Sequence, residues 1–304
     1  MMFMEVKKVI KISNLSKSFS DKKVLENLNL EIKDGEVFGL VGINGAGKST
    51  LLRLISGIYK ADKGSIIIDG EEVFENEKVK NKIFFLPDEP YYAANTTPLS
   101  LISLYETFYN FDKDIYLKYI NDFALPIKKS MHNFSKGMKR QVFIALALAI
   151  KPKYLLLDEA FDGLDPLARL TFKRAIIDLV ENKKTTVIIS SHSLRELEDI
   201  CDSYGLIDKM EISSSGNISE AIEEVHKYQV AFEHIVDKDE FEMEFISYHQ
   251  DKRIIKVVVK DDYETFSEKI KKFKPLIIDE IKIDFEELFI IEVESRGYLN
   301  VKND

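Results

Sequence analysis

One cysteine, Cys201, is all that the sequence of 304 residues contains. A single thiol forms no internal disulfide, which argues against a disulfide-stapled secreted protein and favours a reducing cytosol. Long apolar runs are also missing, since the longest, residues 142–150, is too short for a membrane-spanning helix. Residues 1–12 carry charges throughout and lack the apolar segment of a signal peptide. We therefore expect a cytoplasmic chain, for which any membrane spans come from another polypeptide.

An excess of positive charge is absent too. Acidic residues number 52 and basic residues 43, which gives a formal net charge of −9. Such a chain is a poor candidate for bulk attraction to DNA, RNA or anionic lipid, so we expect no nucleic-acid partner. The sequence has no internal repeat and no low-complexity tract. Its length suits one domain of ordinary core size and a smaller second domain.

Apolar periodicity in the first two thirds of the chain alternates between strand and helix patterns. This alternation predicts an α/β fold with a largely parallel sheet and helices on its faces. Asp69-Gly70 follows a strand pattern and indicates a hairpin turn. The predicted strands are residues 8–12, 24–32, 37–41, 65–68, 83–86, 154–157 and 185–189, and the predicted helices are residues 48–56, 98–124, 136–150, 166–181 and 194–201.

The composition shifts after Lys209. Residues 213–217, with the sequence Ser-Ser-Ser-Gly-Asn, are typical of a linker, so we predict one domain over residues 1–212 and another over 217–304. The second is expected to be a small accessory α+β module. Its predicted strands are residues 228–232, 253–260 and 276–283, and its predicted helices are residues 262–273 and 286–294.

A glycine-rich segment, residues 42–50, lies between a predicted strand and a predicted helix and matches the phosphate-binding P-loop pattern. Glycines let successive backbone N–H groups turn inward around phosphate oxygens, and the helix points its positive dipole end at the anion. Lys48 would reach the β- and γ-phosphates, and the Ser49 hydroxyl would ligate Mg²⁺. A glycine-rich turn without a ligand is the weaker alternative. The residues assigned to the nucleotide are Gly42, Asn44, Gly45, Ala46, Gly47, Lys48, Ser49 and Thr50.

Two carboxylates, Asp158 and Glu159, end the apolar strand pattern of residues 154–157. Ligands of open α/β sheets lie at the carboxyl ends of the strands. Asp158 is suited to hold Mg²⁺, directly or through water, and Glu159 is suited to activate the attacking water as general base. Taken alone, both acids fit equally well as solvent-facing residues at a strand end. The P-loop upstream favours the functional interpretation.

Further motifs along residues 5–210 make the chain resemble ABC ATPases. Residues 134–138 resemble the ABC signature, residues 162–166 resemble the D-loop, and residues 190–192 resemble the switch-histidine segment. Phe19 stands where this family places an aromatic ring against adenine. The order and spacing of these motifs, rather than any one of them, carry the resemblance.

The resemblance implies a fold, a reaction and partners. The fold is a P-loop NTPase of the ABC type, with an antiparallel β subdomain, a helical subdomain at about residues 90–150, and the small C-terminal α+β module. Two such domains pair head to tail, as a homodimer or a heterodimer, around ATP and Mg²⁺. In each site Lys48, Asp158, Glu159 and His192 of one protomer face Ser135 and Gly137 of its partner.

Several of these residues also fit purely structural roles. Ser135 is also suited to be a plain N-cap, His192 to be a histidine at a helix start, and Phe19 to be a core residue. The chain also departs from the family pattern. Asp88 stands at the usual glutamine position and keeps an oxygen for Mg²⁺, but its ionised form donates no hydrogen bond. Lys136 replaces a glycine of the commonest signature.

The sequence thus predicts the ATPase subunit of an ABC transporter, peripheral on the inner face of the cell membrane through a separate membrane-spanning subunit. Aromatic residues between positions 90 and 125 suit a docking groove for short helices of that subunit, or equally an ordinary packed subdomain. A non-transport ABC ATPase that acts on nucleic acid or ribosomes is the alternative. Against it, the chain has one P-loop and no visible coiled-coil insertion. A third alternative, a switch that binds ATP without hydrolysing it, conflicts with the presence of Glu159.

Overall fold

A computed structural model describes residues 9–295 of the chain. It separates into two compact units, Met1–Gly216 and Asn217–Asp304. The ends of the two predicted domains, residues 1–8 and 296–304, and the first residue of the predicted strand 8–12 lie outside the described residues.

An antiparallel sheet opens the first unit, with strand order β2-β1-β4-β5. Apolar and polar residues alternate along β2, so that Leu28, Leu30 and Ile32 are buried on one face. Asp69 and Gly70 have positive φ angles and form the turn between β4 and β5, which confirms the predicted hairpin. The bounds are β1 (Val9–Phe19), β2 (Lys22–Lys33), β4 (Lys63–Ile68) and β5 (Glu71–Glu72).

The second sheet of this unit has six strands in the order β10-β9-β3-β8-β7-β6. The pairs β9–β3, β3–β8, β8–β7 and β7–β6 are parallel, and β3, β7 and β8 are buried along their whole length. The predicted parallel sheet is therefore confirmed. Its strands are β3 (Val37–Val41), β6 (Ile83–Leu86), β7 (Tyr154–Asp158), β8 (Thr186–Ser190), β9 (Ser203–Asp208) and β10 (Glu211–Asn217).

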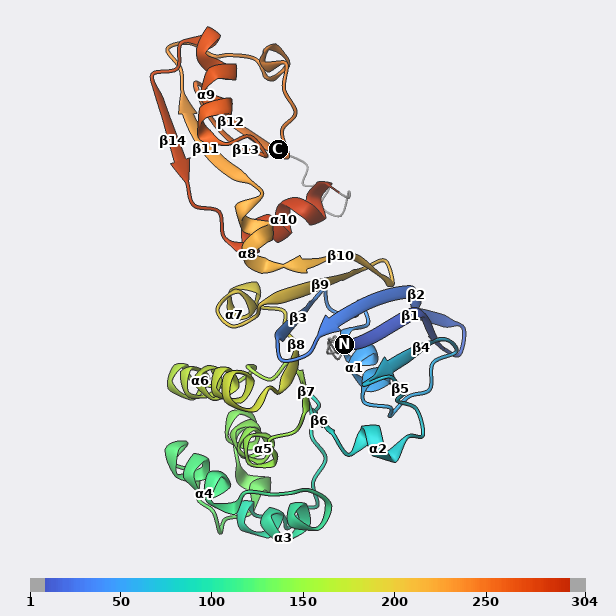
Figure 1. Ribbon diagram of the computed structural model, residues 1–304. Helices are drawn as coiled ribbons and strands as arrows, with labels where there is room; N and C mark the ends of the chain where they lie inside the picture. The colour runs from blue at the N-terminus through green and yellow to red at the C-terminus, as the bar shows by residue number, and fades with distance from the viewer. Residues whose placement is uncertain (1–8, 296–304) are drawn as a thin grey trace, which may run out of the picture. The chain divides into compact units, whose positions relative to one another are not determined.

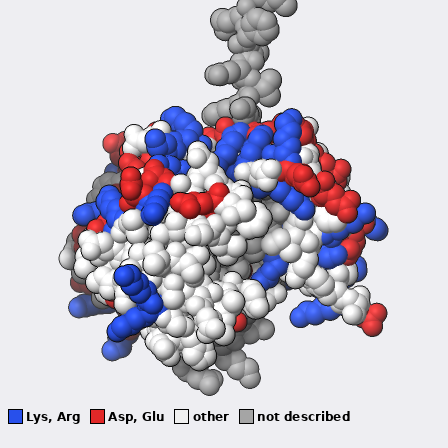
Figure 2. Space-filling view, turned by 90° about the horizontal axis from the view of Figure 1, so that it is seen from below, with Lys and Arg blue, Asp and Glu red and all other residues white. Residues whose placement is uncertain are grey.

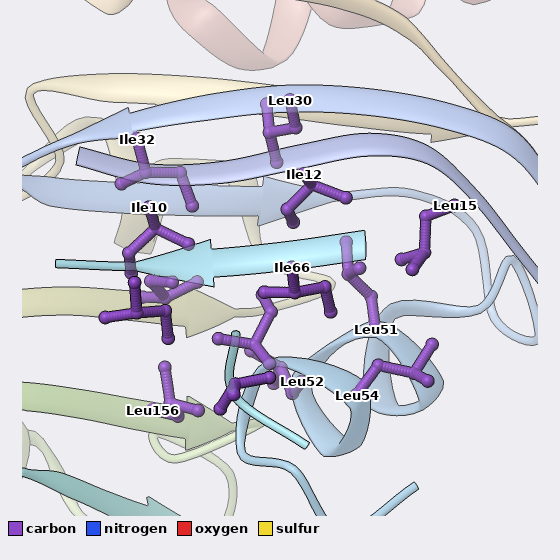
Figure 3. Close-up of a cluster of buried hydrophobic side chains, with 14 of the residues drawn as sticks. Ile10, Ile12, Leu15, Leu30, Ile32, Leu51, Leu52, Leu54, Ile66 and Leu156 are labelled. Atoms are coloured by element: carbon purple, nitrogen blue, oxygen red, sulfur yellow. The ribbon is translucent and has the colours of Figure 1, made fainter. Parts of the chain in front are cut away.

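Helices cover both faces of this parallel sheet (Figure 1). Helices α5 (Lys136–Ile150), α6 (Pro166–Lys183) and α7 (Leu194–Glu198) lie on one side, and α1 (Lys48–Ile55) lies on the other. One buried apolar cluster joins α1 to both sheets, and Figure 3 shows Leu51, Leu52 and Leu54 of α1 pointing toward the strands. This packing fixes the start of α1 against the carboxyl end of β3.

Short helices make up the segment that follows β6. The predicted helical region 98–124 is interrupted: α3 (Pro98–Phe108) ends, and α4 (Lys113–Asp122) restarts at Asp112, whose side chain caps it. The break follows from the capping preference of aspartate, which favours a helix start over a helix interior. The 3₁₀ turn η1 (Met131–Asn133) also lies in this segment, whereas the short helix α2 (Glu77–Lys80) precedes β6.

The second unit is an antiparallel sheet of order β12-β13-β11-β14 with helices on its faces. Tyr228, Phe232 and Phe266 lie in the core between the sheet and α9, and Val258 and Ile283 lie in a second cluster with α10. The predicted α+β module is observed. Its elements are α8 (Ile218–Glu223), β11 (His226–Ala231), η2 (Lys238–Phe241), β12 (Ser247–Asp251), β13 (Ile254–Val259), α9 (Tyr263–Ile270), η3 (Lys271–Phe273), β14 (Ile277–Ile281) and α10 (Phe285–Ser295).

The prediction of a linker at residues 213–217 is wrong. Residues 213–217 are the last five of the seven residues of β10, the edge strand of this sheet, instead of a free connection. Ser213 donates a hydrogen bond to the carbonyl oxygen of Leu206, and the Ser214 and Tyr204 hydroxyl groups lie 3.0 Å apart. Small polar residues suit an edge strand that is open to solvent, and the same composition is typical of linkers. Composition alone does not separate the two.

Candidate functional site

The segment between β3 and α1 follows a tight path that only glycine allows. Gly45 and Gly47 have φ angles of 82° and 110°, and Gly47 is the N-cap of α1. A Cβ atom on Gly47 would lie 2.8 Å from Leu25 Cδ2, and one on Gly42 would lie 2.8 Å from the carbonyl oxygen of Ile207. Both conformation and space therefore require glycine here. Asn44 lies in the same loop, and Thr50 in the first turn of α1.

Lys48 is the first residue of α1, and its side chain is buried. Its Nζ atom donates a hydrogen bond to the carbonyl oxygen of Gly42 at 2.6 Å and lies 3.7 Å from Oε1 of Glu159. Burial lowers the pKa of the Lys48 ammonium group, although the charges of Glu159 and Asp158 oppose this shift. The loop carbonyl thus holds the ammonium group at the mouth of the P-loop.

Asp158 ends β7 and is almost fully buried. Its Oδ1 atom accepts hydrogen bonds from the hydroxyl groups of Ser49 at 2.9 Å and Ser190 at 2.7 Å. Its Oδ2 atom is buried and has no hydrogen-bond partner among the described residues. An unsatisfied carboxylate oxygen beside a serine hydroxyl is a donor set that suits Mg²⁺.

Ser190 belongs to this cluster, although the sequence named it only as part of the switch-histidine segment and gave its side chain no role. It ends β8 and lies directly opposite Asp158 in the parallel register. Its hydroxyl and carbonyl oxygens also accept a hydrogen bond from the backbone N–H of Glu159. The signal was available in the sequence, because the carboxyl ends of two adjacent parallel strands meet at one edge of the sheet.

Glu159 follows Asp158 with a φ angle of 49°, which turns its side chain back over the end of the sheet. Its Oε2 atom accepts a hydrogen bond from the backbone N–H of His192 at 3.2 Å and lies 2.8 Å from His192 Nδ1. The hydrogen bond to Glu159 raises the pKa of His192. Asp162 lies 3.8 Å from the same nitrogen atom. The structure thus brings Lys48, Ser49, Asp158, Glu159 and His192 together.

Asp88, a predicted ligand of nucleotide and Mg²⁺, is held elsewhere. Its Oδ1 atom lies 2.6 Å from the guanidinium group of Arg140 and 3.4 Å from Lys136 Nζ. Among the described residues, no hydrogen bond or ion pair joins Asp88 directly to Ser49 or Asp158. Arg140 bridges this gap, since it also donates to the carbonyl oxygen of Asp158 at 3.2 Å. Sequence reasoning missed Arg140, although an arginine that precedes an apolar helical run was a usable signal.

The predicted signature residues lie at the start of α5. Ser135 is exposed and caps the helix by accepting a hydrogen bond from the backbone N–H of Met138. A Cβ atom on Gly137 would clash with the carbonyl oxygen of Gly163, so the D-loop packs directly on this helix start. In the part of the chain that the structure describes, no hydrogen bond or ion pair joins Ser135 to Lys48, Asp158 or Glu159. The signature residues are therefore separate from the P-loop cluster.

Phe19 ends β1 and is 40% exposed, so its interpretation as a core residue is wrong. Its ring contacts the edge of Tyr59 with centroids 5.3 Å apart, and Lys17 Nζ lies 5.3 Å from its centroid. A half-exposed aromatic pair beside a cation is able to stack against a planar ring. The sequence interpretation had not included Tyr59.

Known proteins resemble this chain along most of its length. The ABC transporter ATP-binding protein YtrB of Bacillus subtilis is 31% identical over 93% of this chain and 97% of its own length. The chain belongs to the ABC transporter family. The family model described as ABC transporter matches residues 25–162, which include the P-loop, the signature and the acidic strand end. The Streptococcus pyogenes protein named lantibiotic transport ATP-binding protein SrtF is 34% identical over 74% of this chain and 99% of its own.

A solved structure agrees with this membership. An ATP-binding subunit of an ABC transporter matches with a TM-score of 0.64 and 27% identity, over 70% of this chain and 91% of that one. The ABC ATPase fold is therefore shown, and this chain is an ATP-binding and ATP-hydrolysing member of the family. YtrB matches more of the chain than the first unit holds, so that likeness extends into the second unit. Among the described residues, no helix has the length and apolarity needed to cross a membrane.

Proposed function

We propose that this member of the ABC transporter family hydrolyses ATP at the Lys48–Asp158–Glu159 cluster and so drives transport through a separate membrane-spanning chain. The observation that carries the proposal is the buried Asp158, whose Oδ1 is held by Ser49 and Ser190 while its Oδ2 stays unpaired. Ser49 and Asp158 would hold Mg²⁺, which offsets the charge of phosphate oxygens when it is bound. Asp88 stays a predicted ligand, and its ion pairs with Arg140 and Lys136 weigh against that role.

Glu159 has the position and the support that a general base needs. Its carboxylate lies between Lys48 and His192, and two hydrogen bonds from His192 fix the direction of one oxygen. A carboxylate held in this way is able to accept a proton from a water molecule beside the γ-phosphate. His192 keeps the base oriented, and Lys48 places positive charge where charge develops on the phosphate. Phe19 stacks against the adenine ring.

The complete site requires a second protomer in this proposal. Ser135 is exposed at the start of α5 and offers a hydroxyl group and the first N–H groups of a helix, which suit phosphate oxygens. Because Ser135 and Gly137 are separate from the P-loop cluster, they serve the ATP bound by a partner cassette. The partner is a second copy of this chain or a related cassette. ATP between the two protomers stabilises the pair, and hydrolysis releases it.

The membrane-spanning partner docks on the helical segment after β6. Helix α3 exposes Leu99, Leu104 and Phe108, the last of them 70% exposed. A hollow of about 430 Å³ lies beside it, lined by Leu104, Phe108, Tyr105, Tyr109, Lys80 and Asn81. Seen from the end of the molecule at which α3 lies, uncharged side chains form a broad surface with charged side chains at its rim (Figure 2). Such a surface suits a short amphipathic helix of a membrane subunit, which supports a peripheral position at the inner face of the cell membrane.

The second unit is an accessory module for dimer contacts or regulation. Support for a role outside catalysis comes from its core, which is apolar and aromatic. Removal of residues 217–304 should therefore weaken ATP-dependent dimers or change turnover. ATP-dependent dimers with normal turnover after that deletion would contradict an accessory role of this kind.

Turnover of purified protein with MgATP tests the catalytic assignment. Glu159→Gln should bind ATP and form stable dimers while the turnover rate falls about 10²- to 10⁴-fold, because the amide accepts no proton. Glu181→Gln, at an exposed site of α6, is the matched control and should match wild type. Equal turnover in Glu159→Gln and wild type would show that Glu159 is not the general base. Copurification with a membrane-spanning subunit, to be sought first among neighbouring reading frames, tests the transport partner.

A further inference from the structure

Arg140 is a buried charge in the first half of α5, just before the apolar run of that helix. Its side chain is 1% exposed, and the residues that follow it, from Val142 to Ile150, are buried and apolar. Removing a guanidinium group from water costs several kcal/mol unless hydrogen bonds and an opposite charge compensate. The position of Arg140 therefore depends on the groups that surround it.

The compensating groups come from the ends of two different strands. One guanidinium nitrogen of Arg140 lies 2.6 Å from Asp88 Oδ1, just beyond β6. The other nitrogen donates to the carbonyl oxygen of Asp158 at 3.2 Å, at the end of β7, and to that of Pro87 at 3.4 Å. Arg140 thus ties α5 to two strand ends of the catalytic sheet. One of these strand ends carries the carboxylate that lies beside Ser49.

Lys136 adds a second cation to this link. Its Nζ atom lies 3.4 Å from the same Asp88 oxygen, and Lys136 directly follows Ser135 at the start of α5. Asp88 and Lys136 are the positions at which the sequence departs from the glutamine and the glycine usual in the family. The two departures therefore meet, and they build one ionic cluster with Arg140. An amide in place of Asp88 would leave the buried guanidinium without a full opposite charge.

We propose that Arg140, held by Asp88, is a positioning residue that couples the two ATP sites of a cassette pair. The inference rests on the proposed head-to-tail dimer. In that dimer one protomer uses Asp158 at its own ATP and Ser135 at the ATP of its partner. Arg140 lies between these two groups within the protomer, because it sits on the helix that Ser135 caps and contacts the backbone of Asp158. Movement of α5 at one ATP therefore shifts the strand end at the other.

Two conservative variants test the link. Asp88→Asn keeps the side-chain volume but removes the charge, and Arg140→Lys keeps a charge but loses the fork that reaches several acceptors. Each should lower kcat about tenfold, which lies within the usual range for coupling between sites, and should bring the Hill coefficient for ATP close to one. ATP affinity, measured in the Glu159→Gln background, should stay within about threefold of wild type in Arg140→Lys, since Arg140 is not among the predicted nucleotide ligands. Lys136→Ala, an exposed partner, should change kcat less.

Arg174→Lys, at an exposed site of α6, is the matched control and should keep wild-type turnover and cooperativity. A thermal melt shows whether Arg140→Lys is folded, and Asp88→Asn carries the test if it is not. Wild-type kcat and Hill coefficient in folded Asp88→Asn would overturn the inference. Absence of ATP-dependent dimers in wild type would instead overturn the proposed dimer, so the two failures are distinguishable.

Discussion

The two units of this chain bury different kinds of side chain. In the first unit, Lys48, Arg140, Asp158 and Ser190 are buried at the carboxyl ends of parallel strands, where they bond to one another or to nearby loops. In the second unit, every described side chain that is buried is apolar or aromatic. A buried polar group costs free energy unless it is compensated, so its retention indicates a task other than stability. The chemistry of the chain therefore lies in the first unit, and the second has the core of a scaffold.

The largest effect should come from the buried ammonium group of the first unit. Lys48→Ala removes the charge that faces the phosphates, and we expect ATP hydrolysis to fall at least about 100-fold. ATP affinity should fall as well, because binding and catalysis use the same group. Fluorescent-nucleotide titration and a phosphate-release assay measure the two losses. Lys183→Ala, at the exposed end of α6, serves as the control, and intact affinity in Lys48→Ala would break the assignment of chemistry to this unit.

A core substitution in the second unit should affect stability and spare catalysis. Phe266 is fully buried and stacks on Tyr228 with ring centroids 4.3 Å apart. We expect Phe266→Ala to lower the free energy of unfolding of this unit by about 3–5 kcal/mol, as measured by denaturant titration. Tyr263→Ala, at a ring that is 45% exposed, should cost far less. Turnover should persist in both variants, and loss of turnover without unfolding would show that the second unit has a direct part in catalysis.

The ion pairs of Asp69 in the first unit should have a smaller effect on stability. Asp69, in the turn after β4, accepts hydrogen bonds from Lys82, Lys153 and the Tyr154 hydroxyl. Burial acts to raise the pKa of Asp69, but these hydrogen bonds outweigh it and hold the pKa well below the ordinary value of 3.8. Asp69→Asn should therefore lower stability at neutral pH by about 1–3 kcal/mol.

The same depressed pKa sets the sign of the pH dependence. The stability that Asp69 contributes is fully present above its ordinary pKa and is lost as the pH falls through its lower folded value. Denaturant titrations of Asp69→Asn and wild type should therefore converge in strong acid. Asp62→Asn, which breaks an exposed pair with Lys17, is the control and should cost under about 1 kcal/mol. If the difference in the free energy of unfolding between wild type and Asp69→Asn grew in acid, this pH dependence would be contradicted.

The smallest effect concerns His192. Its pKa is raised by the hydrogen bond to Glu159, so the contribution of this pair to stability is full below the ordinary value of 6.5. That contribution is lost as the pH rises through the raised value. Because His192 is exposed, we expect a change under about 1 kcal/mol between wild type and His192→Gln at pH 6, and none in alkali. Histidine NMR titration measures the pKa, and an unshifted value would show that Glu159 does not hold the ring.

Much of the fold followed from patterns that are local in the sequence. Periodicity predicted β3, β6, β7 and β8 of the parallel sheet but missed β9, and Asp69-Gly70 predicted the hairpin, because backbone preferences act over a few residues. The prediction of a linker failed because it considered composition alone. Residues 213–217 have a linker composition, yet pairing with β9 makes them a strand. Strand pairing depends on a neighbour that composition does not reveal.

The candidate site divides in the same way. Gly42 to Ser49 and the Asp158-Glu159 pair were readable from the sequence, because each is a contiguous segment whose residue types fit one ligand. By contrast, Asp88 meets Arg140 52 residues further along the chain, and Phe19 meets Tyr59 of the connection between α1 and β4. Only the tertiary structure decided that Asp88 is an ion-pair partner of Arg140 and that Tyr59 packs on Phe19. Contacts between distant segments depend on how strands and helices pack, and that packing is a property of the whole core.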